Sequence, residues 1–105
     1  MEQDKKTLAS QLRAARALIG LSQVQLSELA EVSSMTVKRA EGSGKPYPST
    51  DAIEAIRSAL EAAGIEFIET NGSGAGVRFS DGGVDFELRD PRGRLVQLQA
   101  KHTKK

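Results

Sequence analysis

The N-terminal part of the chain repeats its apolar positions with the period of an α-helix. Between residues 8 and 19 these positions form one helical stripe, made of Leu8, Leu12, Ala15, Leu18 and Ile19. Gly20 follows directly, and glycine accepts the left-handed conformation that ends many helices. The pattern therefore predicts a first helix over about residues 7–19.

Two short helices are predicted next, and the start of each is marked by a serine. Ser22 is followed three residues later by Gln25, a spacing that forms a capping box at a helix N-terminus, and it predicts a helix over 23–30. Ser33 is the natural N-cap of a third helix over 34–42. Only Glu31 and Val32 connect the two helices, so the angle between them is fixed, as in a helix-turn-helix.

A fourth helix is predicted over residues 50–63, after which the pattern changes. Its apolar stripe is followed by Gly64, and the positions then alternate between apolar and polar as in half-buried strands. The alternation predicts three or four antiparallel strands, over about 65–69, 76–79, 84–89 and 94–100. The fold class expected is mainly α, with four to five helices followed by a small antiparallel β element.

These elements predict a domain organisation with three parts. Residues 1–64 are expected to form a helical domain, residues 65–100 a C-terminal β element, and residues 101–105 a flexible basic tail. A small open sheet leaves its edges and one apolar face uncovered, and a second copy of the chain would cover both. Residues 65–100 are therefore expected to form a dimerisation element.

Composition and charge exclude more than they establish. The chain has 105 residues, no cysteine and a net charge of +1. Residues 1–48 carry seven basic and five acidic residues, a net of +2, so basic side chains gather there only weakly. Without cysteine, a disulfide framework and a cysteine-based metal site are both excluded. No apolar run approaches membrane-spanning length and no secretory signal is recognisable, so a cytoplasmic protein that does not contact the membrane is expected.

The helical part resembles a known family. The residues that carry the resemblance are "LRAAR" and "GLSQVQLSELAEVSSMTVKRAEGSG", within residues 8–44. In capping, turn length and apolar positions they are similar to the phage-repressor-like helix-turn-helix domains of the Cro/cI or XRE family. The resemblance covers roughly residues 7–63. It implies a transcriptional regulator whose third helix lies in the major groove of double-stranded DNA.

The resemblance also implies roles for single residues. It places Ser34, Met35, Arg39 and Thr36 toward base edges, and it places Gln23 and Lys45 at the DNA phosphates. Lys38 is a further candidate for a phosphate contact, although a solvated surface role is the more ordinary interpretation. An arginine at position 39 suits base recognition because its planar fork can bond O6 and N7 of guanine together, which discriminates by about 1–3 kcal/mol.

Two further features concern the architecture of this motif. Arg16 and Glu41 match a pair that forms a partly buried ion pair between the first and third helices in similar domains. Glu31 departs from the family pattern, because the turn position usually held by glycine has a carboxylate here. A non-glycine residue with positive φ is strained, so the turn either accepts that strain or has a different geometry.

The function expected is a sequence-specific regulator, a repressor that binds a palindromic or nearly palindromic operator as a dimer. One alternative is an antitoxin-type autoregulator that also binds a toxin protein. Another is a protein-interaction module that no longer binds DNA. The carboxylates and the lone His102 do not converge on a nucleophile or a metal site, and "NGSGAG" leads into another strand rather than a helix. An enzyme, a metal and a cofactor are therefore not expected.

Overall fold

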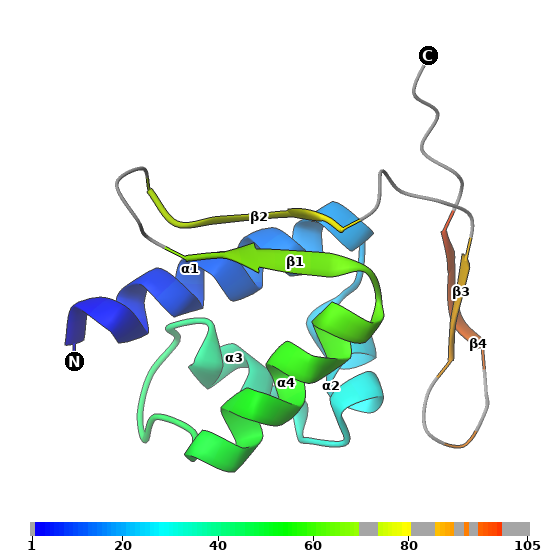
Figure 1. Cartoon of the computed structure of the whole chain (residues 1–105). Coiled ribbons are helices and arrows are strands. Elements are labelled where there is room, and N and C mark those ends of the chain that lie inside the picture. The colour runs from blue at the N-terminus through cyan, green and yellow to red at the C-terminus, as the bar shows by residue number, and fades with distance from the viewer. Residues whose placement is uncertain (1, 70–73, 81–85, 90–91, 93–94, 100–105) are drawn as a thin grey trace.

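The computed structural model describes residues 2–69, 74–80, 86–89, 92 and 95–99, and it is mainly helical. Four helices come first, followed by two antiparallel β-hairpins (Figure 1). The helices are α1 (Glu2–Ile19), α2 (Gln23–Ala30), α3 (Ser34–Ala40) and α4 (Thr50–Ala62). The expected fold class, a helical part followed by a small antiparallel β element, is confirmed. No helix in these ranges is long and apolar enough to cross a membrane.

The predicted capping of the helices is confirmed by hydrogen bonds. The Ser22 hydroxyl accepts from the Gln25 backbone N–H at 3.0 Å, and the Gln25 side chain accepts from the Ser22 N–H at 2.8 Å. The Ser33 hydroxyl accepts from the Thr36 N–H at 3.0 Å, and Ser49 caps α4 in the same way. The helix starts thus follow from side chains that satisfy otherwise orphaned N–H groups.

Two helix ends differ by two residues or more from the sequence prediction. Helix α1 begins at Glu2 rather than near residue 7. Polar helix formers can extend a helix beyond its apolar stripe, and apolar periodicity does not detect such a turn. Helix α3 ends at Ala40 rather than 42, because Glu41 already has φ −86° and ψ 9°, and Gly42 has φ +100°.

The core lies between the four helices. Its fully buried members come from every helix and include Leu12, Ile19, Leu26, Val37, Ile56 and Leu60. Leu21, before the N-cap of α2, is also buried in this cluster. Each helix contributes one apolar stripe. A stripe is removed from water only when it packs against the stripes of the other helices.

The C-terminal strands do not form the single open sheet that the sequence predicted. Strands β1 (Ile65–Ile68) and β2 (Gly76–Phe79) pair with each other, and β3 (Phe86–Arg89) pairs with β4 (Leu95–Gln99) in a second sheet. The pairing of β3 with β4 shifts register between Leu88 and Arg89. Alternation identifies strands but not which strands share a sheet, because pairing depends on the path of the chain between them.

Strand β1 packs against the helical core. The expectation that its apolar face is uncovered is therefore wrong. The side chains of Ile65 and Phe67 are buried in the same cluster as the helical residues. In Figure 1 the β1–β2 hairpin lies along α1 and above α4. The core therefore extends past Gly64, the expected end of the helical domain.

A buried glutamine on α1 holds the β1–β2 hairpin. The Gln11 amide nitrogen donates to the carbonyl of Ile68 at 3.1 Å and to the carbonyl of Gly76 at 2.9 Å. These two residues are register partners at the end of the ladder where the chain passes from β1 to β2. One side chain of α1 therefore fixes both strands at the same level.

Several sequence predictions fall outside the described residues. They are residues 70–73 of the turn "TNGSGA", residues 90, 91 and 93 of the turn "DPRG", the carboxylates Asp81, Asp85 and Asp90, and the basic tail 101–105 with His102.

Candidate nucleic-acid interface

Helices α2 and α3 form a helix-turn-helix whose turn contains one left-handed residue. Glu31 has φ 59° and ψ 43°, and its N–H donates to the Ser27 carbonyl. The Val32 N–H bonds the same carbonyl at 3.1 Å. The question raised by the carboxylate at this position is thus resolved in favour of the strained turn, with the backbone geometry that glycine adopts most easily.

Glu41, directly after α3, is the centre of a buried polar cluster. Its side chain is only 3% exposed, and Arg16 binds both carboxylate oxygens, Nε to Oε2 at 2.8 Å and Nη2 to Oε1 at 3.0 Å. The predicted Arg16–Glu41 ion pair is confirmed. A two-pronged pair of this kind fixes orientation as well as charge, so it joins the C-terminal end of α3 to α1.

The first helix holds Glu41 by a second arginine. Arg13 Nη1 donates to the Glu41 carbonyl, and Arg13 Nη2 donates to the Ser10 hydroxyl at 3.0 Å. Arg13 was not singled out in the sequence, because an arginine on a polar helix face looks like an ordinary solvated residue. Its position one turn before Arg16 was the available signal, since residues three apart lie on one helix face.

Gln23 completes the cluster from the first residue of α2. Its Nε2 donates to Glu41 Oε1 at 2.9 Å. The side chain therefore braces α3 against α2, in addition to the phosphate contact that the family resemblance implies. One N–H and the carbonyl oxygen of the amide are not used in this bond, and the phosphate contact stays a prediction.

The outer face of α3 presents the side chains expected at base edges. Met35 is 47% exposed, whereas Val37 and Ala40 on the inner face are fully buried. Ser34, Thr36 and Arg39 are half-buried and Lys38 is exposed. The Thr36 hydroxyl lies 2.9 Å from the Ser33 hydroxyl, so it already takes part in the helix cap.

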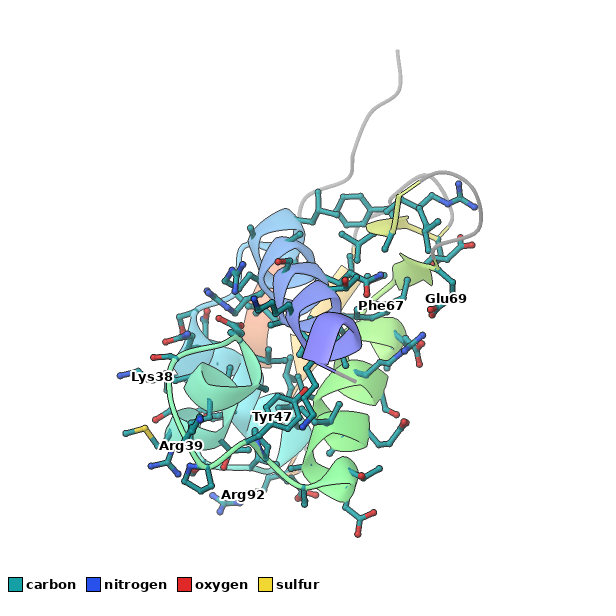
Figure 2. The ribbon with its side chains drawn as sticks, turned by 90° about the vertical axis from the view of Figure 1, so that its left-hand side faces the viewer. Lys38, Arg39, Tyr47, Phe67, Glu69 and Arg92 are labelled. Atoms are coloured by element: carbon teal, nitrogen blue, oxygen red, sulfur yellow. The ribbon has the colours of Figure 1, made fainter. Side chains whose placement is uncertain are left out.

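Within the described part of the chain, the basic side chains of α3 differ from four other arginines in having no protein partner. Arg13, Arg16, Arg57 and Arg78 all donate to protein oxygens. By contrast, Lys38 and Arg39 make no ion pair or side-chain hydrogen bond within the described part of the chain, and neither does Lys45 beyond the helix. Figure 2 shows Lys38 and Arg39 leaving α3 on the side of the molecule away from Phe67 and Glu69.

Comparison with known proteins adds no assignment. No protein-family model matches the chain, and no curated protein sequence matches it. Among the described residues, no group of three or more histidine, cysteine or carboxylate side chains could hold a metal ion.

Proposed function

We propose that this protein is a sequence-specific DNA-binding regulator that inserts α3 into the major groove of double-stranded DNA. The observation that carries the proposal is the contrast between the two faces of α3. Its inner face and C-terminal end are fixed by Val37, Ala40 and the Glu41 cluster. Its outer face offers Arg39 and Lys38 without protein partners in the described structure.

The chemistry of these side chains divides them into two roles. The Arg39 guanidinium, which has no partner among the described residues, has five N–H donors in a rigid fork, which suits the edge of a guanine. Met35, with nearly half its surface exposed, offers an apolar contact for thymine methyl groups. Lys38, Lys45 and the remaining amide groups of Gln23 would bind phosphates, which positions the helix but reads no sequence. Ser34 and Thr36 lie at the helix start, within the same outer surface.

Selection of bound sites from random duplexes is the experiment that tests this function. It should return a defined motif, and binding to that motif should weaken steeply as salt rises because counterions are released from neutralised phosphates. Arg39→Gln should reduce discrimination between the motif and a scrambled duplex by about tenfold or more. Arg57→Gln, the same change on α4, is the matched control. Recovery of no motif would refute the proposal.

We also propose that two copies bind one operator, held together through residues 65–100. A dimer places two recognition helices about one DNA turn apart. Strand β2 supports this, because it has β1 along one edge and no other described strand along the other. Such an edge can pair with a second chain.

Sedimentation of the full chain tests the dimer. A monomeric mass at micromolar concentration would contradict it. A chain shortened to end after Ser80 keeps the Ile65 and Phe67 side chains in the core. If β1 and β2 form the interface, this chain stays dimeric, and if β3 and β4 form it, the mass falls to that of a monomer.

A further inference from the structure

An open cleft lies between the first half of α1 and the loop that joins α3 to α4. It has a volume of about 380 Å³ and is lined by Lys5, Lys6, Ala9, Ser10, Arg13, Gly42 and Tyr47. Three of these residues are basic, and none of the described residues that line it is acidic. The cleft is separate from the outer face of α3, and in Figure 2 Tyr47 lies beside the first turns of α1, apart from Lys38 and Arg39.

The apolar floor of the cleft is formed by Ala9 and Gly42. A Cβ on Gly42 would lie 3.8 Å from the Ala9 Cβ and 3.5 Å from Arg13 Nη1. Gly42 also has φ +100°, which other residues rarely adopt. Both distances are ordinary van der Waals contacts, so glycine at position 42 is favoured by its backbone conformation and not by a lack of space.

The basic side chains are arranged around this floor with donors to spare. Arg13 uses Nη1 for the Glu41 carbonyl and Nη2 for Ser10 in the described structure, out of five N–H donors. The Lys5 ammonium lies 4.8 Å from the centre of the Tyr47 ring, a cation–π distance. Burial raises the pKa of Tyr47, so its phenol stays protonated and can donate a hydrogen bond.

We propose that this cleft binds a small planar anion, an aryl carboxylate or aryl phosphate. The volume falls in the range of ligand pockets, which are mostly apolar with a few convergent polar groups. The flat body would lie on Ala9 and Gly42 beside the Tyr47 ring. The anionic group would accept hydrogen bonds from Arg13 and be neutralised by Lys5 and Lys6. A DNA strand fits less well, because its convex backbone offers phosphates but no apolar group for this floor.

The test uses the full chain and four probes: benzoate, phenyl phosphate, benzamide and inorganic phosphate. Titration followed by amide chemical shifts should give saturable changes at Ala9, Ser10 and Gly42 with benzoate or phenyl phosphate. Whichever of the two binds more tightly identifies the anionic group. Neutral benzamide lacks the charge and inorganic phosphate lacks the ring, so each should bind at least about tenfold more weakly.

Matched variants test the residues of the cleft. Lys6→Gln and Arg13→Gln should each weaken binding of the preferred probe by about tenfold, whereas Lys38→Gln should leave it unchanged. Amide chemical shifts of residues outside the cleft should be unchanged in each variant, which shows that the variant is folded. If Arg13→Gln does not fold, Lys5→Gln removes a different positive charge from the cleft. Shifts that fail to saturate, equal binding of benzamide, or equal loss in Lys38→Gln would overturn the proposal.

Discussion

Arg16 on α1 and Glu41 after α3 form a two-pronged ion pair in which the two partners differ in exposure. The Arg16 side chain is 23% exposed, and the Glu41 side chain is 3% exposed. The guanidinium can therefore reach water if the pair is broken, but the carboxylate cannot. The charge of Glu41 is tolerated inside the protein because Arg16 and Gln23 supply donors to it.

The first prediction is that Arg16→Met destabilises the fold by about 3 kcal/mol, because it leaves a buried carboxylate without its counter-charge. Urea denaturation measures this loss. Arg57→Met is the matched control, since the Arg57 partners Glu61 and Glu69 are 47% and 71% exposed. Exposed ion pairs contribute only about 0–1 kcal/mol, so equal losses in the two variants would contradict the importance assigned to the Glu41 cluster.

The second prediction concerns the left-handed turn residue. Glu31→Gly should stabilise the protein by about 1 kcal/mol, since glycine adopts φ 59° without strain. Glu31→Ala separates this effect from the loss of charge, because alanine removes the carboxylate and keeps the strained Cβ. It should leave stability nearly unchanged. Thermal denaturation of both variants at the same pH gives the comparison, and equal stabilisation by alanine would assign the effect to charge.

The third prediction concerns the Gln11 link between α1 and the β1–β2 hairpin. Gln11→Glu replaces both N–H donors by a carboxylate oxygen facing two carbonyls, and it should cost about 2–3 kcal/mol. Hydrogen exchange should show lost protection in β1 and β2 before α2 and α3. Gln11→Met removes the donors without adding charge, so its cost should be smaller. Unchanged hairpin protection in Gln11→Glu would contradict this role.

The fourth prediction is a pH dependence at the exposed pair Glu66–Arg78, whose closer bond is 3.0 Å. The hydrogen bond from Arg78, together with its charge, lowers the pKa of Glu66 below 4.5. A lowered folded-state pKa adds stability above the unfolded pKa, and this stability is lost as pH falls through the folded pKa. The denaturation midpoint of Glu66→Gln should therefore lie slightly below that of the parent chain at neutral pH.

The two midpoints should converge as the pH is lowered past the depressed pKa of Glu66. Glu54→Gln, on α4, is the control, because Glu54 makes no ion pair among the described residues. A difference between parent and Glu66→Gln that stays constant down to strongly acidic pH would exclude the ionised carboxylate as its cause.

Much of the helical part could be predicted because its information is local. A capping serine, its partner three residues later and an apolar stripe all lie within one or two helical turns, and the Ser22–Gln25 box is formed as expected. The start of α1 at Glu2 could not be found in this way, since polar residues in a solvated helix turn leave no apolar period.

What the sequence by itself determined is the order of helices and strands, the caps, the short connection between α2 and α3, and the apolar stripes of the core. Tertiary structure decided which distant groups meet. It divided the strands into two sheets, buried Phe67 among the helices and turned Gln23 onto Glu41. The physical reason is the distance along the chain over which each interaction acts. Capping and periodicity act between near neighbours, whereas a buried carboxylate or a free strand carbonyl is satisfied by whichever donor the whole fold brings within 3 Å or so.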